Sequence, residues 1–406
     1  MISQVQDYSS GPVTALPGKS ASSADPKLRV LHVVSRLGLG GTEHGVLKLL
    51  RGLAAEEFEH SICAVRGIDS AFGERIHPEV ALYSVGDPKP GFQFPLLRLA
   101  RLMREVRPHI VHSRNFGALD AVPAARMAGV PVAIHSEHGY ELELVAGLPL
   151  RRRLVCRAVF PLADAVLTVT KELRDFHSRQ SWTKKDRFRV IYNGVDTERF
   201  FPRPGQAAKA RDEQGIPPGR IVIGSIGRLV PIKDHRTLLK AAERLLGNGK
   251  DIHVLIVGAG AELKGLQTHV RESSTLQGRV SFAGASDNIP ELLSAMDIFV
   301  LPSISEGMSN TILEAMASGV PVIAGCTGGN PELISEERCG RLFTPRDDAG
   351  LAEQIAYLTD NAQLRAALGS AGRDRVIHDF SLARMIAQYR DLYFELAAQR
   401  RIGKGN

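Results

Sequence analysis

Two pairs of charged residues in the second half of the chain have the types and spacing to bind a ligand rich in hydroxyls and phosphate. Glu306 lies in a short predicted loop, and Glu314 follows it about two turns later. Arg228 and Lys233 lie in a loop that follows a predicted strand at 221–226. Carboxylates accept hydrogen bonds from hydroxyls, whereas two cations beside a helix start could clamp a diphosphate. A nucleotide sugar carries both kinds of group.

The stretch 298–324 predicts the element that positions the two glutamates. The apolar run 298–301 is typical of a buried strand, and Ser309 has the residue type of a helix N-cap. A helix is predicted over 311–318, and Gly319 follows it as the C-cap. In an open α/β sheet, the loop between strand and helix lies in the crevice at the carboxyl ends of the strands, where ligands bind.

Two glycine-rich loops follow predicted strands at points where a ligand could approach the backbone closely. The first loop contains Gly40 and Gly41, and the second contains Gly329 and Glu332. The first loop lacks the third glycine of a dinucleotide fingerprint, because Glu43 occupies that position, which disfavours an oxidoreductase. An ordinary tight turn is the alternative for both loops.

Ordinary structural explanations exist for the charged residues too. Glu306 and Glu314 alone could be solvated, and Arg228 and Lys233 could be exposed charges on a loop. His138 ends a predicted strand, where a histidine could hold a ligand or be a satisfied structural residue. From the residue types alone, both explanations stay open.

Length and composition indicate a globular protein of two domains. The 406 residues are 44% hydrophobic and 23% charged, and the four cysteines contain no C-x-x-C pair. Scattered cysteines fit a reducing compartment and neither a disulfide framework nor a zinc site. No apolar run has the ~18–20 residues of a membrane span. Residues 1–26 lack the regions of a signal peptide and are predicted to be a disordered tail.

The net charge of +7 is concentrated in one segment. Between Arg151 and Arg189 there are eleven Lys or Arg residues and four acidic ones, so the rest of the chain is near neutral. Such a patch predicts contact with an anionic surface, either a bilayer or a lipid-linked acceptor. A solvated face is the alternative. Nucleic acid is disfavoured, because aromatic residues are sparse there and no binding motif appears.

Together these motifs resemble the family-4 (group 1) retaining glycosyltransferases. The likeness runs from Lys27 to Leu396, and the Glu306–Glu314 segment looks most like that of sugar transferases of bacterial exopolysaccharide assembly. The motifs that carry the resemblance are Gly40-Gly41-Thr42-Glu43, Glu137-His138-Gly139, Asn193-Gly194-Val195-Asp196, Arg228 with Lys233, Glu306 with Glu314, and Gly328-Gly329-Asn330-Pro331-Glu332.

The resemblance implies an α/β protein of the GT-B fold, with two Rossmann-like, doubly wound parallel-sheet domains facing a cleft. Alternating strand and helix patterns in both halves of the chain agree with this. We expect an acceptor domain at 27–201, a donor domain at 202–381, and a terminal helix at 382–398 that joins the first domain. Residues 202–209, rich in proline and glycine, are predicted to be the linker.

The same resemblance implies roles for individual residues. Arg228 and Lys233 would neutralise the diphosphate, Glu306 would hold hydroxyls of the donor sugar, and Glu314 would hold the ribose. His138 would contact the donor sugar near the reacting carbon. Further donor-binding residues would be Gly40, Gly41, Met308, Ser309, Asn310, Gly329 and Glu332. No Asp-x-Asp appears among the motifs, so neither a catalytic metal nor a cofactor is predicted.

The sequence therefore predicts a retaining hexosyltransferase that uses a UDP- or GDP-sugar and a glycan or polyprenyl-linked acceptor. We expect a cytoplasmic location, with peripheral contact at the inner face of the plasma membrane through Arg151–Arg189. Two alternatives stay open. One is a nucleotide-sugar 2-epimerase, which would need no acceptor; the other is a catalytically silent subunit of a polysaccharide assembly complex.

Overall fold

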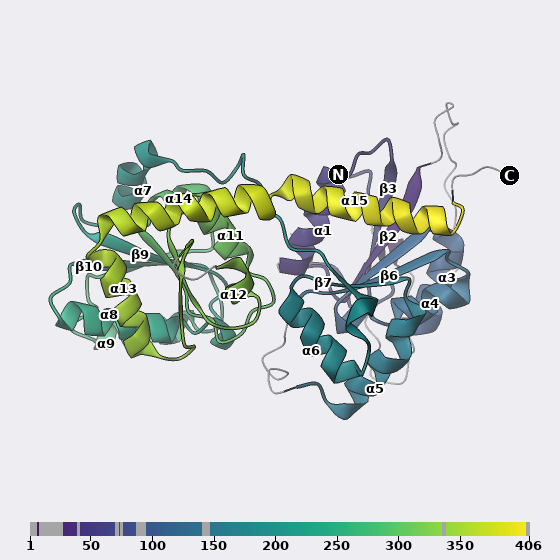
Figure 1. The fold of residues 1–406 in the computed structure, drawn as a ribbon, viewed down its shortest axis with the longest axis horizontal. Coiled ribbons are helices and arrows are strands. Elements are labelled where there is room, and N and C mark those ends of the chain that lie inside the picture. Colours follow the sequence, from purple (N-terminus) through teal and green to yellow (C-terminus); the bar gives the residue numbers. More distant parts are fainter. Residues whose placement is uncertain are drawn as a thin grey trace. The chain divides into compact units, whose positions relative to one another are not determined.

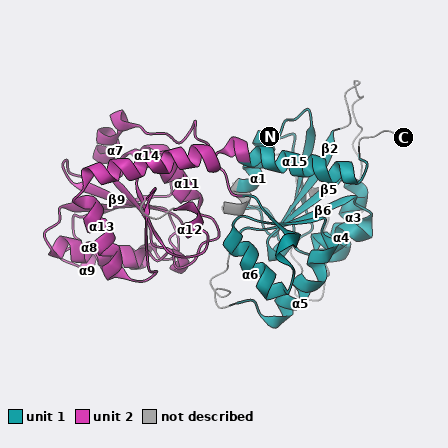
Figure 2. Cartoon of the chain, in the orientation of Figure 1, with its two compact units in different colours: residues 1–139, 146–191, 385–406 teal, residues 140–145, 192–384 magenta. Residues whose placement is uncertain are grey.

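The computed structural model describes residues 6–7, 27–38, 41–69, 73, 76–86, 95–139, 147–334 and 338–402. The chain divides into two compact units (Figure 2). Unit 1 comprises residues 1–139, 146–191 and 385–406, and unit 2 comprises residues 140–145 and 192–384. Each unit is built on one parallel sheet with helices between the strands (Figure 1).

The sheet of unit 1 has the order β1-β4-β3-β2-β5-β6-β7-β8, and every neighbouring pair is parallel. The chain builds outward from β2 in one direction and then from β5 in the other, so the switch point lies between these two strands. The strands are β1 Gln6–Asp7, β2 Leu28–Val34, β3 Phe58–Ala64, β4 Ala81–Ser84, β5 Ile110–Arg114, β6 Val132–Glu137, β7 Ala165–Thr168 and β8 Phe188–Val190. Except for β1, the predicted tail lies outside the described residues.

The helices of unit 1 cover this sheet and bury the apolar side chains of its central strands. They are α1 Gly41–Gly52, α3 Pro95–Val106, η1 Phe116–Ala118, α4 Ala121–Ala128, α5 Leu150–Val159, η3 Phe160–Leu162, α6 Lys171–Ser181, η4 Lys185–Arg187 and, from Met385 onward, α15 Leu382–Gln399. None of the described helices has the length and apolar composition to cross a membrane.

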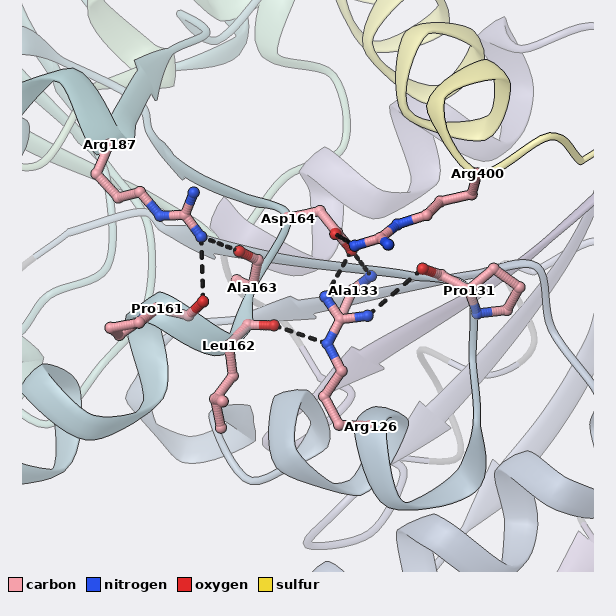
Figure 3. A network of polar contacts seen from close by, with 9 residues as sticks. All are labelled: Arg126, Pro131, Ala133, Pro161, Leu162, Ala163, Asp164, Arg187 and Arg400. Atoms are coloured by element: carbon pink, nitrogen blue, oxygen red, sulfur yellow. Dashed lines mark hydrogen bonds and ion pairs between the residues drawn. The ribbon is translucent and has the colours of Figure 1, made fainter.

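A half-buried carboxylate fastens the end of α15 to the rest of unit 1. Asp164, at the start of β7, accepts hydrogen bonds from Arg126 at 2.7 Å, from the backbone N–H of Ala133 at 2.7 Å and from Arg400 at 2.6 Å (Figure 3). Burial alone would raise the pKa of Asp164, but these hydrogen bonds outweigh burial and lower it. The ionised carboxylate therefore links three segments that are far apart in the sequence.

The sheet of unit 2 has the order β11-β10-β9-β12-β13-β14, again with every pair parallel. Its switch point lies between β9 and β12. The strands are β9 Ile221–Ile226, β10 Ile252–Val257, β11 Val280–Gly284, β12 Ile298–Leu301, β13 Val322–Gly325 and β14 Arg341–Phe343. The helices are η5 Pro204–Gln206, α7 Ala207–Glu213, η6 Pro231–Lys233, α8 His235–Gly247, α9 Leu263–Glu272, α10 Ile289–Ser294, α11 Asn310–Ala317, α12 Asn330–Leu333, α13 Asp348–Thr359 and α14 Ala362–Asp379.

The segment between the units differs from the expected linker. The units divide between residues 191 and 192, earlier than the expected boundary at 201/202, and Val195 donates its backbone N–H to Phe380 within unit 2 at 3.0 Å. The prediction of a linker through residue 209 is wrong, because α7 begins at Ala207. This short helix is held by Arg211, which donates to Asp297 and to the carbonyl of Ala295, both at 2.9 Å.

Candidate functional site

An ion pair joins the two loops at the switch point of unit 2. Lys233 ends the 3-10 turn that follows β9, and Glu306 lies in the loop between β12 and α11. The ammonium Nζ of Lys233 donates to Oε1 of Glu306 at 2.5 Å, and the two side chains are only 18% and 10% exposed. The structure thus brings together two of the residues that the sequence singled out, although they are 73 positions apart.

Arg228 opens the same loop but differs from Lys233 in its surroundings. Its side chain is exposed, and it makes no hydrogen bond or ion pair with the part of the chain that the structure describes. The loop backbone is fixed, because Leu229 donates its N–H to Ala259 at 2.9 Å and accepts one from Glu262 at 2.9 Å. Arg228 is therefore a cation on a fixed loop that can turn toward an anionic group.

Glycines let neighbouring loops pack against the Arg228 and Glu306 segments. Gly258 has a φ of +144°, and a Cβ there would lie 1.9 Å from the carbonyl oxygen of Gly227. Gly328 has a φ of +52°, and a Cβ there would lie 1.8 Å from the carbonyl oxygen of Glu306. No side chain fits at either distance. These glycines thus serve the packing of the site loops on each other.

Helix α11 presents polar groups at its first turn, as the sequence predicted. Ser309 is confirmed as the N-cap, since its side chain accepts from the backbone N–H of Ile312 at 3.3 Å. Met308 is buried, and its sulfur accepts the backbone N–H of Asn193 at 3.0 Å. Asn310 and the half-buried Glu314 are four positions apart, so they share one face of α11. The amide oxygen of Asn310 is buried without a partner among the described residues.

The second glycine loop lies beside the first turn of α11. The backbone N–H of Gly329 donates to Gly307 at 2.9 Å, and Thr327 donates its hydroxyl to the carbonyl of Ile304 at 2.9 Å. Glu332, in the short α12, accepts a hydrogen bond from the hydroxyl of Tyr192 at 2.9 Å. Gly329 thus lies next to the Glu306 loop, whereas one carboxylate oxygen of Glu332 has a partner within the protein.

A cavity of about 270 Å³ opens at the carboxyl ends of the strands in unit 2. Its lining comes from the loops after β9, β10, β12 and β14 and from helices α8 and α9: Val230, Pro231, Asp234, His235, Arg236, Glu262, Leu266, Ile304 and Arg346. Burial, and then the charge of Lys233, lower the pKa of His235 to about 4, so its imidazole is neutral. This cavity places a concave surface where parallel α/β sheets bind ligands.

His138, the site residue predicted in the first half of the chain, belongs to unit 1. It follows β6, and its backbone N–H donates to the side-chain oxygen of Asn115 at 2.9 Å. Burial, and then the charge of Arg114, lower the pKa of His138 to about 3, so the imidazole is neutral. Its Nε2 atom is buried without a partner in the described ranges. Gly40 lies outside the described residues, and Gly41 is the first residue of α1.

A buried polar network beneath His138 was missed by the sequence reasoning. Arg114, at the end of β5, is only 1% exposed and contacts Nδ1 of His32 at 3.1 Å. His112 pairs with His32 across the strands and contacts the hydroxyl of Tyr393 at 2.7 Å. Burial, and then the Arg114 charge, hold the pKa values of both histidines well below their usual range. Histidines inside otherwise apolar strands were the available signal.

No group of three or more His, Cys, Asp and Glu side chains within the described ranges is arranged to hold a metal ion. The prediction that the reaction needs no metal stays a prediction.

The fold and the site define a class of protein. Two Rossmann-like units, each with a switch point in a parallel sheet, form the GT-B architecture. HepE from Anabaena, solved in complex with UDP, matches this structure with a TM-score of 0.80 at 20% identity, covering 91% of this chain and 100% of that chain. Likeness at this level of identity shows the fold, and the predicted GT-B fold is confirmed.

Sequence comparison identifies the family. Residues 39–199 match the model "Glycosyltransferase Family 4", and residues 206–375 match "Glycosyl transferases group 1". An Escherichia coli UDP-Gal:alpha-D-GlcNAc-diphosphoundecaprenol alpha-1,3-galactosyltransferase is 26% identical over 93% of this chain and 100% of its own length. A Corynebacterium glutamicum GDP-mannose-dependent monoacylated alpha-(1-6)-phosphatidylinositol monomannoside mannosyltransferase is 30% identical over 83% of this chain and 91% of its own. The chain belongs to the group 1, family 4 glycosyltransferases and is a nucleotide-sugar-dependent enzyme of EC 2.4.

Proposed function

We propose that the enzyme transfers a sugar, with retention at the anomeric carbon, from a UDP- or GDP-sugar to a lipid-linked or oligosaccharide acceptor in exopolysaccharide assembly. The observation that carries this proposal is the Lys233–Glu306 ion pair at the switch point, together with Arg228 on the same loop, whose side chain has no partner among the described residues. Lys233 is then paired with the carboxylate of Glu306, and Arg228 is exposed to solvent. A diphosphate with an attached sugar can engage all three groups.

Donor binding would exchange the partners of this pair. The diphosphate takes the ammonium of Lys233 and the guanidinium of Arg228, which gain most as negative charge builds on the leaving group. Released from Lys233, the carboxylate of Glu306 accepts hydrogen bonds from hydroxyls of the donor sugar. The backbone N–H groups at the start of α11, after Met308 and the Ser309 cap, add donors to the phosphates.

The remaining site residues would orient the donor and admit the acceptor. Glu314 holds the ribose, and Asn310, on the same face of α11, contributes to donor binding. The neutral imidazole of His138 hydrogen-bonds the donor sugar near the anomeric carbon. Gly329 and Glu332 would contribute to the binding of the phosphates and the sugar, while Gly40 and Gly41 would leave room for the acceptor. These assignments rest on the likeness of each motif to its counterpart in the family.

The reaction is a front-face displacement. The acceptor hydroxyl oxygen forms a bond to the anomeric carbon on the face from which the diphosphate departs, and the bond between that carbon and the phosphate oxygen breaks. The leaving diphosphate carries the bonding electrons and takes the hydroxyl proton. No pair of carboxylates needs to flank the bond, in contrast to a retaining glycoside hydrolase.

A basic, partly apolar face of unit 1 supports a lipid-linked acceptor at a membrane surface. On α5, Leu150 and Leu154 are 62% and 54% exposed, and the exposed Arg151 lies among them. The guanidinium of Arg153 stacks over the exposed Trp182 at 4.2 Å. Leucine, tryptophan and arginine together suit the interface of an anionic bilayer. Both relatives described above have lipids in the names of their acceptors. We infer a cytoplasmic enzyme that docks peripherally on the inner face of the plasma membrane.

A thermal-shift panel of UDP-, GDP- and ADP-sugars, with the free nucleotides and NAD beside them, tests the donor assignment. A ligand that binds only the native state raises its melting temperature. We expect stabilisation by UDP or GDP and by one of its sugars, and none by NAD. No response to any nucleotide would favour a silent subunit of an assembly complex. Rearrangement of the donor sugar without an acceptor would instead favour a 2-epimerase.

A further inference from the structure

Asn115, which no motif of the sequence includes, has a strained backbone immediately beside His138. It lies between β5 and η1, with φ 58° and ψ 165°, a region that is essentially reserved for glycine. Strain of this kind persists only where the surrounding structure fixes it, and it concentrates at functional sites. The neighbourhood is tightly packed, since a Cβ on Gly117 of η1 would lie 2.4 Å from the hydroxyl of Ser35.

Two hydrogen bonds from Asn115 hold the end of β6 on either side of Glu137. The backbone N–H of Asn115 donates to the carbonyl of Ser136 at 2.8 Å. Its side-chain oxygen accepts the backbone N–H of His138 at 2.9 Å. The imidazole of His138 has an unpartnered, buried Nε2, so no ring hydrogen bond from the described residues orients it through that atom. The hydrogen bond from the backbone N–H of His138 to Asn115 therefore holds the backbone of this histidine in place.

We propose that Asn115 is a positioning residue for the transfer reaction, held in a strained conformation so that its side chain fixes the backbone of His138 against the donor sugar. This inference rests on the proposed role of His138. A substitution that relieves the strain at such a residue should raise stability and lower activity, because the backbone of His138 would lose the hydrogen bond that positions it. An ordinary structural asparagine would show the opposite behaviour, with stability and activity lost together.

Substitution by glycine and by aspartate separates these outcomes. Glycine adopts the backbone conformation without strain but cannot accept the hydrogen bond, whereas aspartate keeps the acceptor and adds a negative charge. That charge would join the groups already facing His138, namely Arg114 and His112 from β5 and His135 and Glu137 from β6. A nearby anion favours the protonated imidazole, so N115D should raise the pKa of His138.

The experiment measures kcat, donor KM and melting temperature for N115G, N115D and H138A, with UDP-galactose or GDP-mannose, whichever stabilises the wild type. We expect N115G to match or exceed the wild-type melting temperature, with kcat at least tenfold lower and donor KM within threefold. N115D should keep kcat within threefold at pH 8, with the acid limb of its kcat profile at higher pH than in the wild type.

A matched control is N361A. Asn361 also accepts a backbone N–H through its side chain, from Leu364 at 3.0 Å, but it caps α14 in unit 2. This variant should lower the melting temperature and leave kcat unchanged. Wild-type kcat in N115G, or an unmoved acid limb in N115D, would overturn the positioning role while H138A stays inactive. An active H138A would instead overturn the proposed role of His138 itself.

Discussion

Replacing Lys233 with Met, alone and together with Glu306→Gln, separates the contribution of the Lys233–Glu306 ion pair to stability from the contribution of Lys233 to turnover. Breaking an exposed pair costs about 0–1 kcal/mol, and breaking a fully buried one costs about 3–5 kcal/mol. These side chains are 18% and 10% exposed, so K233M should cost roughly 2 kcal/mol by leaving the Glu306 carboxylate unpaired. For a unit of this size, that lowers the melting temperature by about 4–8 °C.

The double variant K233M/E306Q should regain most of this stability, because neither side chain then carries a charge that lacks a partner. Turnover should behave differently. Lys233 would stabilise the charge that develops on the diphosphate, and removal of one such donor costs roughly 100- to 1,000-fold in kcat. We therefore expect both variants to be inactive to a similar degree, although their melting temperatures differ.

Differential scanning fluorimetry and a nucleoside diphosphate release assay measure the two quantities on the same preparations. The matched control is K250M, which breaks the pair of Lys250 with Asp360 at the opposite end of the unit 2 sheet. It should change the melting temperature slightly and leave turnover intact. Turnover that returns together with stability in the double variant would refute the reasoning, since the pair would then be structural.

Two further predictions concern unit 1. D164N should lower the melting temperature at neutral pH, and its difference from the wild type should shrink as the pH falls below about 4. The sign follows from the lowered pKa of Asp164: the ionised carboxylate stabilises the fold above the unfolded-state pKa, and this contribution is lost through the lower folded-state pKa. A pH-independent difference would contradict it. R151E/L154S should bind phosphatidylglycerol vesicles at least fivefold more weakly than wild type, because one basic residue near an anionic surface contributes about 1 kcal/mol. K240E, on the exposed face of α8, is the control. Equal vesicle binding by R151E/L154S and by K240E would contradict the proposal that α5 contacts the membrane.

Local patterns in the sequence were sufficient to predict most elements of both sheets. The strand at 298–301, the Ser309 cap and the helix that follows were predictable because apolar runs, capping residues and glycine stops act over a few residues. Helix α7 was missed because it is short and polar and depends on Arg211 reaching Asp297. Helix α5 ends at Val159 and continues as a 3-10 turn that contains Pro161, whose missing N–H cannot join the α-helical ladder.

The sequence by itself determined the family, the parallel α/β architecture and the residue types of the site. Only the tertiary structure decided which of these residues meet. Lys233 and Glu306 face each other because β9 and β12 are neighbours at the switch point, a pairing that no local pattern contains. Gly258 and Gly328 are required by backbone contacts between loops, and the strain at Asn115 is sustained by packing around β5 and β6. The sequence therefore sets the residue types at this site. The packing of segments far apart in the sequence sets which of these residues come into contact.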